Sequence, residues 1–364
     1  MFSRIRPGFA RSLSSFAAQR ETLLREIYAP FANLEKGSPE YENLALSGKV
    51  WEDYFQPADS ERYGYLKIQQ LYTPILREID TLKESMRSLR SAIGQDLIAE
   101  YAHQSVQIED NKLELRESIK INDYLASALF KKVDLASTSA SEISQTSLPD
   151  VHYLLPHADA SQVAELRNHI VASHWVTDAA LQNLGTPGLN EDDVRCLSAL
   201  VNKGTNSEWI YTHGWGKRIV LGDYRQTPIS VRSNPLCIFP YHPEVPALMR
   251  RFFQWRDKAT YKKDLHPLIL ACQATIYFLH IHPFPDGNGR VSRLMMQDYM
   301  VRQGYVPVVI QGLERQDYIR MVQDAQRGEP REFVTKILTT QLEEMHTFRM
   351  RELAQEIPAV GRKR

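Results

Sequence analysis

Residue types suited to chemistry gather between positions 282 and 293, where the chain reads HPFPDGNGRVSR. The glycines permit a tight turn that brings backbone N–H groups close to a ligand. The helical pattern that follows adds unpaired N–H groups and the positive end of a helix dipole. Arg290 and Arg293 are three residues apart, so they project from one side of the first helical turn and offer bidentate contacts to oxyanions. The segment therefore predicts a pocket for several phosphate groups.

Two other side chains of this segment could act beside bound phosphates. Mg²⁺ usually accompanies phosphates and takes hard oxygen ligands, few of them from the protein, and Asp286 fits that role. His282 precedes it in the chain, and an imidazole that titrates near neutral pH can take a proton from an attacking hydroxyl. A zinc site on His280 and His282 is the alternative, but it needs further ligands and leaves the phosphate loop unexplained. Phe284 is expected to be a buried anchor beneath the loop.

The composition favours an ordinary soluble globular protein, with 364 residues, 43% of them hydrophobic and 24% charged. Basic and acidic residues balance at 44 each. Proteins that act on nucleic acid usually show a basic excess, so DNA or RNA is disfavoured as the main partner, and the basic tail at 352–364 is interpreted as solvated. No apolar run approaches the roughly 20 residues of a membrane-spanning helix. The three separated cysteines (Cys196, Cys237 and Cys272) predict no disulfide framework and favour a reducing compartment.

The first twenty residues differ from the rest of the chain. Residues 1–20 contain four arginines, several serines and no acidic residue. Phe2, Ile5, Phe9, Leu13 and Phe16 recur at spacings that line one face of a helix. This composition is typical of a mitochondrial transit peptide, and a mobile or partner-docking helix of a cytosolic protein is the alternative. The expected location is therefore the mitochondrial matrix or the cytoplasm.

The elements that must position the 282–293 segment are expected to be mostly α-helical. Residues 21–133 predict an N-terminal helical region, with an apolar stripe from Ile75 to Leu97 on one helix face. The Ser/Thr-rich stretch 134–150 predicts a linker and a domain boundary. Two short β-branched segments, 218–225 and 229–232, predict a β-hairpin. Further helices are predicted at 164–181, 191–201, 246–255, 267–279, 289–303, 316–326 and 333–351.

The segment HPFPDGNGRVSR resembles the Fic family motif HxFx(D/E)GNGRxxR at every defining position. Chance agreement at so many specified positions is negligible, and the resemblance extends from about Glu165 to Ile337. It implies a Fic-type helical bundle with a β-hairpin flap within residues 151–351. The other family-like positions are Asn168-His169, Gly222-Asp223-Tyr224-Arg225, His266-Pro267 and Gly304-Tyr305-Val306-Pro307.

The resemblance also implies transfer of AMP from ATP to a Ser, Thr or Tyr hydroxyl of a target protein. His282 would be the general base, Asp286 would hold Mg²⁺ and Arg293 would reach the γ-phosphate. The flap would cover the nucleotide and align the target segment as an added strand. Tyr318 and Gln326 would lie near the ribose and adenine, and homodimers are common in proteins resembling this one. The nucleotide-binding residues would be Asp286, Gly287, Asn288, Gly289, Arg290, Val291, Ser292, Arg293, Val231, Arg232, Ser233, Asn234, Tyr318 and Gln326.

A second motif lies upstream, where residues 105–111 read SVQIEDN and resemble the inhibitory motif (S/T)xxxE(G/N) of self-restrained Fic proteins. Ser105, Glu109 and Asn111 are its candidate inhibitory residues, and Asp110 departs from it, because Gly or Asn is usual there. The resemblance implies that Glu109 pairs with Arg293 and occupies the arginine that the γ-phosphate needs. Repulsion between Asp110 and Glu109 could weaken this pair.

Other functions remain open at this point. A phosphotransferase of the related Doc type would be expected to carry a lysine after Gly-Asn, where this chain has Gly289-Arg290. A non-catalytic ATP-binding regulator would be expected to lack His282, and a DNA-binding regulator would need a helix-turn-helix. Removal of AMP from a modified protein is a second activity of the same site, in which Glu109 would orient a water molecule.

Overall fold

The computed structural model describes residues 7–86, 90–213, 219–230, 236–310 and 312–356. These residues form a mostly α-helical protein, as predicted, and contain no β-strand. The N-terminal half contains α1 (Pro7–Ile27), α2 (Pro39–Ser47), α3 (Lys49–Phe55), α4 (Tyr65–Leu71), α5 (Thr73–Ser85), α6 (Arg90–Asp96), α7 (Ile98–Gln107), α8 (Leu115–Leu125), α9 (Ala140–Gln145) and α10 (Ala160–Gln182). The C-terminal half contains α11 (Glu191–Asn202), α12 (Asn206–His213), α13 (Val245–Lys262), α14 (Pro267–Ile281), α15 (Asn288–Arg302), α16 (Arg315–Gln326) and α17 (Arg331–Glu356).

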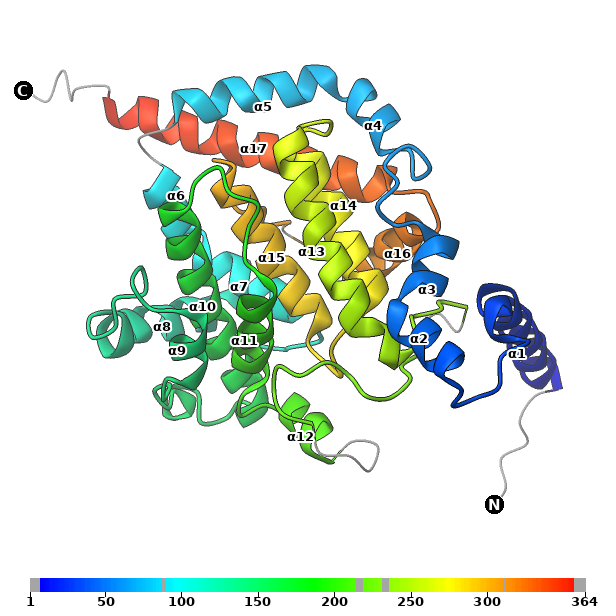
Figure 1. Cartoon of the computed structure of the whole chain (residues 1–364). Coiled ribbons are helices and arrows are strands. Elements are labelled where there is room, and N and C mark those ends of the chain that lie inside the picture. Colours follow the sequence, from blue (N-terminus) through cyan, green and yellow to red (C-terminus); the bar gives the residue numbers. More distant parts are fainter. Residues whose placement is uncertain (1–6, 87–89, 214–218, 231–235, 311, 357–364) are drawn as a thin grey trace, which may run out of the picture.

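The centre of the molecule is built around α14, with α13 and α15 packed against it (Figure 1). The sequence of α14 is apolar all round, which is typical of a helix covered on every side. Leu268, Leu270, Phe278 and Ile281 of this helix are all buried. Helix α15 packs in turn on α10, and α5 and α17 run together across one side of the bundle (Figure 1). The helices predicted within 151–351 are therefore confirmed, and α14 and α15 form the core that carries the 282–293 segment.

Local sequence explains where these two central helices begin and end. The ring of His266 accepts a hydrogen bond from the backbone N–H of Leu268, and Pro267 occupies the first turn of α14, where its missing N–H is harmless. The helix ends at His282, which has left-handed backbone angles (φ 51°, ψ 62°). Helix α15 starts after Gly287, which is also left-handed (φ 81°). Residues 282–287 thus form a short loop between two buried helices.

The N-terminal region shares the core of the C-terminal helices. Helix α7 packs on α10 and contacts α15, while α5 packs on α17. Buried side chains from both parts belong to one hydrophobic cluster, including Ile98 and Tyr101 of α7 and Phe278 of α14. This packing brings the C-terminal end of α7, with residues 105–111, beside the start of α15.

Three expectations from the sequence need correction. The apolar stripe between residues 75 and 97 is divided among α5, α6 and the turn before α7, not carried by one helix. Residues 134–150 include α9, whose Ala140 and Ile143 are buried against the core, so this stretch is not wholly an irregular linker. Residues 219–225 form no strand, because their backbone bonds go to other segments: the N–H of Ile219 donates to Tyr211 (2.9 Å) and that of Arg225 to Pro283 (2.9 Å).

The ends of the chain and the flap are described only in part. Val231, Arg232, Ser233 and Asn234 of the expected flap lie outside the described residues. Residues 1–6 of the N-terminal segment and 357–364 of the basic tail also lie outside them. From Pro7 the N-terminal segment is helical, and Arg20 of α1 donates to the carbonyl of Cys237 (3.1 Å). None of the described helices has the length and apolar character needed to cross a membrane.

Candidate active site

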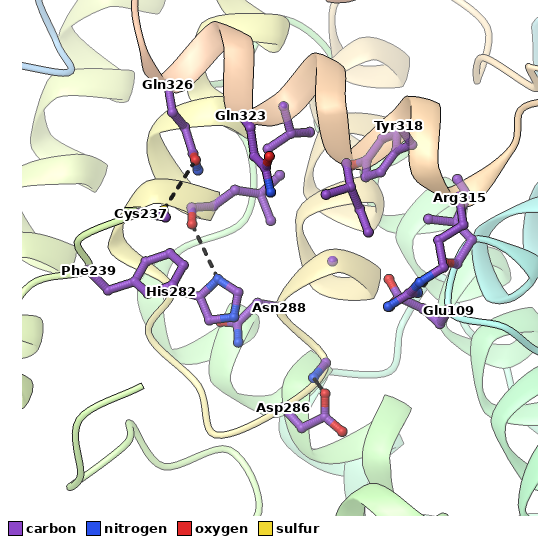
Figure 2. Close-up of a pocket in the computed structure, with 16 residues that line it drawn as sticks. Glu109, Cys237, Phe239, His282, Asp286, Asn288, Arg315, Tyr318, Gln323 and Gln326 are labelled. Carbon is purple, nitrogen blue, oxygen red and sulfur yellow. Dashed lines mark hydrogen bonds and ion pairs between the residues drawn. The ribbon is translucent and has the colours of Figure 1, made fainter. Parts of the chain in front are cut away.

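A cavity of about 250 Å³ lies between α16 and the loop that joins α14 to α15 (Figure 2). From the predicted set, its walls include His282, Asp286, Gly287, Asn288 and Gly289 on the loop side, with Tyr318 and Gln326 on α16 and Glu109 from the inhibitory segment. The structure thus brings together in one cavity residues from three separate parts of the chain.

The position of His282 follows from its strained backbone. Left-handed angles in a residue other than glycine cost about 1–2 kcal/mol and persist only where the surroundings hold them. Here the N–H of His282 closes the last turn of α14 by donating to Phe278 (3.0 Å), and its carbonyl accepts from Nε of Arg225 (2.8 Å). This left-handed backbone ends α14 at His282, and the ring of His282 lines the cavity.

The ring of His282 is prepared to accept a proton. Its Nδ1 lies 3.3 Å from the carbonyl oxygen of Leu279, which favours the proton on Nδ1 and leaves Nε2 as the basic atom (Figure 2). The ring packs against Phe239, with centroids 4.6 Å apart. Burial and, secondarily, the charge of Arg225 lower the pKa of His282 to about 4. The imidazole is therefore neutral at pH 7, as a general base requires.

His280 lies in a different environment from His282. Its ring packs against Trp51 (4.7 Å) and Phe55 (4.6 Å), and burial lowers its pKa to about 3. Among the described residues no cluster of three or more His, Cys, Asp or Glu side chains could hold a metal ion. These two histidines contact different parts of the core, and the described residues do not support the zinc alternative.

The loop is held in shape by hydrogen bonds within itself. The side chain of Asn288 accepts from the N–H of Phe284 (2.9 Å) and donates to the carbonyl of Phe284 (2.8 Å). The ring of Phe284 is fully buried, as expected for an anchor. A Cβ at Gly287 would approach the amide of Asn202 to 2.7 Å, and one at Gly289 would collide with the carboxylate of Glu109. Glycine at 287 suits the left-handed backbone there (φ 81°), and glycine at 289 leaves the space that the Glu109 carboxylate occupies in this state.

Asp286 lies at the edge of the cavity beside the helix α12. One of its carboxylate oxygens accepts from the hydroxyl of Ser207 (2.6 Å), and its carbonyl accepts from the hydroxyl of Tyr211 (3.1 Å). A single carboxylate next to a phosphate-binding loop fits Mg²⁺, which takes most of its ligands from phosphates and water. The α12 contacts were not foreseen, because the spacing of Ser207 and Tyr211 is that of any helix face.

Arg290 is placed differently from the expectation. Its guanidinium is buried beneath the loop, where it pairs with Glu165 (2.9 Å) and donates to Asn202 (2.9 Å) and Ser207 (3.1 Å). Its side chain does not line the cavity, and neither do the side chains of Val291 and Ser292, which are buried. In this state these three buried side chains hold the first turn of α15 in place and so orient its backbone N–H groups.

Arg293 is joined to the inhibitory segment, as the sequence implied. Its Nη2 lies 2.7 Å from Glu109 Oε1 and 2.7 Å from the carbonyl of Ser105, and its Nε donates to the Ser105 hydroxyl (2.7 Å). Burial alone would raise the pKa of Glu109, but the charges of Arg293 and Arg290 lower it below its usual value. The guanidinium also lies over the ring of Tyr318 (5.3 Å). Tyr318 therefore contacts the arginine end of the cavity, whereas Gln326 lies at the other end (Figure 2).

A second arginine, Arg315 at the start of α16, was not foreseen. Its guanidinium lies 3.3 Å from Glu109 and 3.3 Å from Asp110, and it also donates to the carbonyl of Ile108. Asp110 has a left-handed backbone (φ 69°). Glycine and asparagine adopt this conformation most readily and aspartate tolerates it, which explains why the motif prefers the first two and why Asp110 is accommodated.

Asn111 completes the attachment of the inhibitory segment. Its side-chain amide donates to the carboxylate of Glu165 (2.8 Å) and to the carbonyl of Gln162 (2.9 Å) on α10. Glu165 is the same residue that pairs with Arg290. The inhibitory segment is thus connected to the 282–293 segment through both of its arginines.

Comparison with known proteins relates part of this chain to a family model and its fold to solved structures. Residues 188–300 match the model of the Fic/DOC family. Protein adenylyltransferase Fic of Drosophila willistoni is 34% identical over 139 residues, which are 38% of this chain and 27% of that protein, and its Drosophila melanogaster counterpart gives the same values. The chain thus spans about a quarter of the length of the curated relatives that it matches.

Two solved structures show the same fold. Fic-1 from C. elegans superposes with a TM-score of 0.55 at 17% identity, covering 94% of this chain and 99% of that one. A Fic domain containing signaling protein from Bacteroides thetaiotaomicron gives a TM-score of 0.55 at 19% identity, covering 75% and 95% of the two chains. The helical architecture, including the N-terminal region in the first case, is that of these proteins.

Proposed function

We propose that this chain, which carries a Fic domain, is a protein adenylyltransferase that moves AMP from ATP to a hydroxyl of a target protein and is restrained by Glu109. The observation that carries the proposal is the shared cavity, in which neutral His282, Asp286 and the glycine-rich start of α15 lie together. The Drosophila relatives named protein adenylyltransferase support it.

In this reaction a Ser, Thr or Tyr hydroxyl of the target attacks the α-phosphorus of ATP. Nε2 of His282 takes the hydroxyl proton as the new P–O bond forms. The bond from the α-phosphorus to the bridging oxygen breaks, and pyrophosphate leaves. The backbone N–H groups at the start of α15 bind the phosphate oxygens and stabilise the charge that develops on them.

Asp286 is the residue that would hold Mg²⁺, since its carboxylate is at the cavity edge. The metal would neutralise charge on the leaving pyrophosphate. In the present state one oxygen of this carboxylate accepts from Ser207 of α12 (2.6 Å) and the other accepts from the N–H of Gly287 (2.7 Å), which together fix its orientation.

Adenine and ribose would lie against the C-terminal part of α16. Ile319 and Val322 offer an apolar wall there, and Gln323 and Gln326 line the same helix face (Figure 2). This placement retains Gln326 near the base. It assigns Tyr318 to the phosphate end instead, because its ring lies over Arg293.

The restraint follows from the charge pair. Glu109 occupies Arg293 and faces the cavity beside Gly289, where the terminal phosphate of ATP would bind. A phosphate carries more charge than a carboxylate, so Arg293 binds the γ-phosphate once Glu109 is removed. With Glu109 present, ATP binds with its α-phosphate turned away from the attacking hydroxyl.

The test uses the Glu109→Gly variant with ATP labelled at either the α- or the γ-phosphate. Label from the α-position should enter protein, either the chain itself or a target in a lysate, and label from the γ-position should not. Transfer of γ-label would establish a kinase of the Doc type, and transfer of neither label would reject group transfer to protein.

Removal of AMP is the second candidate, because Glu109 faces the same cavity as His282. A carboxylate there could orient a water molecule for attack on the phosphorus of a modified hydroxyl. In that case wild type should release AMP from protein modified by the Glu109→Gly variant, and Glu109→Gln should not. Equal release by both proteins would exclude this role of Glu109.

A further inference from the structure

Arg225 is buried directly behind the catalytic loop, with only 2% of its surface exposed. Its Nε donates to the carbonyl of His282 (2.8 Å), and its Nη2 donates to the carbonyl of Pro240 (2.7 Å). Its Nη1 donates to the carbonyl of Thr227 (3.2 Å), and its backbone N–H donates to that of Pro283 (2.9 Å). One residue therefore joins three separate stretches of main chain.

The contacts of this guanidinium are unusual for a buried arginine, because the hydrogen bonds described above all go to main-chain carbonyl oxygens. Burial lowers the pKa of Arg225 to about 10, so the side chain stays protonated at neutral pH. The last carbonyls of a helix have no partner within the helix and carry the negative end of its dipole. The carbonyls of Ile281 (3.4 Å) and His282 are such groups at the end of α14, and Arg225 satisfies both.

We infer that Arg225 is a positioning residue for catalysis: its guanidinium holds the left-handed backbone of His282 and thereby aims the imidazole into the cavity. The inference rests on the proposed function. A lysine could supply the charge, but it has no planar fork that reaches several carbonyls at once. The geometry of the donor group, and not its charge alone, is therefore what the site requires.

Arg225 also ties the catalytic loop to the neighbouring part of the cavity wall. Pro240, which accepts from its Nη2, directly follows Phe239, whose ring packs on His282. Cys237 of the same stretch lines the cavity. Loss of the guanidinium therefore disturbs both the backbone that carries the imidazole and the ring that packs against it.

The experiment compares substitutions at Arg225 in the active Glu109→Gly background. Arg225→Lys should lower kcat for AMP transfer by about tenfold to a hundredfold, the effect of a misplacement near 1 Å. The KM for ATP and the affinity for ATP measured by calorimetry should change by less than about threefold, because Arg225 does not line the cavity. An unchanged kcat in a folded Arg225→Lys protein would overturn the inference.

A pH profile separates positioning from charge. The charged groups that face His282 are Arg225, Asp286 and Glu109, and the background variant lacks Glu109. Arg225→Gln removes a positive charge, so the acid limb of its kcat profile should move to higher pH. Arg225→Lys keeps the charge, so its acid limb should stay in place while the plateau falls. If both variants moved the limb equally with unchanged plateaus, the role of Arg225 would be electrostatic and the inference would be wrong.

Arg302→Lys is the matched control for general destabilisation. Arg302 is a buried arginine at the far end of α15, bonded to Asp298 (2.8 Å) and Thr186 (2.7 Å). This variant should lower the melting temperature yet keep the kcat of its Glu109→Gly parent. If it lost as much kcat as Arg225→Lys, the effect at Arg225 would be structural. An inactive Glu109→Gly parent would instead reject the proposed function, so the two failures are distinguishable.

Discussion

The catalytic loop 282–289 and the inhibitory segment 105–111 face the same cavity, but they are held there by different forces. The loop is fixed by main-chain hydrogen bonds, by the amide of Asn288 and by the buried ring of Phe284. The inhibitory segment acts through charge pairs with Arg293 and Arg315, which lie far away in the chain.

Because of this difference, the contact of Glu109 can be replaced while the shape of the catalytic loop is kept. The loop is built into the ends of two buried helices and is held by buried hydrogen bonds, including those from Arg225. The contact of Glu109 with Arg293 can be exchanged for a phosphate, because both partners of the arginine are anions. The catalytic loop is therefore preformed, and the contact between Glu109 and Arg293 restrains it reversibly.

The largest effect is expected at the loop itself. His282→Ala in the Glu109→Gly background should lower AMP transfer by about a hundredfold to ten-thousandfold, because the proton acceptor is lost. ATP binding, measured by calorimetry, should be retained. His346→Ala removes a histidine that pairs with Glu78 on the surface and should leave transfer unchanged. Full activity of His282→Ala would remove this residue from the mechanism.

The next effect should come from the charge of the inhibitory segment. Glu109→Gln keeps the size of the side chain and removes its charge, and it should raise auto-modification at saturating Mg-ATP by about a hundredfold, as expected when the α-phosphate is realigned. Asp123→Asn, which changes an exposed carboxylate on α8, is the control and should match wild type. If Glu109→Gln were as slow as wild type, the restraint would not act through this charge pair.

A smaller effect is expected from the second arginine. Arg315→Ala should raise the activity of wild type by about 1.4-fold to 5-fold, since a partly exposed ion pair contributes about 0.2–1 kcal/mol. In the Glu109→Gly background the same change should give no further increase. Arg320→Ala, an exposed arginine on the same helix that pairs with Glu332, provides the control. An increase that persists without Glu109 would show that Arg315 acts elsewhere.

The smallest effect is expected at Asp110. Arg315 lies equally close to Asp110 and Glu109, so much of the repulsion between the two carboxylates is already offset. Asp110→Gly and Asp110→Asn should each make the protein quieter, by less than about threefold on the scale of a partly exposed pair. Both replacements also suit the left-handed backbone at this position. A rise in auto-modification in either variant would show that the Asp110 charge supports the restraint.

The sequence by itself determined the helical class, most of the later helices and the composition of the catalytic loop. Those features are local: the apolar period sets the helices, and the 282–293 residues carry their chemistry in their own order. The resemblance to the inhibitory motif also implied that Glu109 pairs with Arg293, and this pair lies just beyond the end of α7.

Only the tertiary structure decided which group each side chain meets. Arg290 and Arg293 are equivalent in the sequence pattern, yet Arg290 is buried against Glu165 while Arg293 meets Glu109. Arg225 is a family-like position without an assigned role and Arg315 belongs to no motif, and their contacts come from segments distant in the chain. Such contacts depend on how the helices pack and on which buried polar groups need hydrogen-bond partners. The spacing of residues along the chain predicts neither of these.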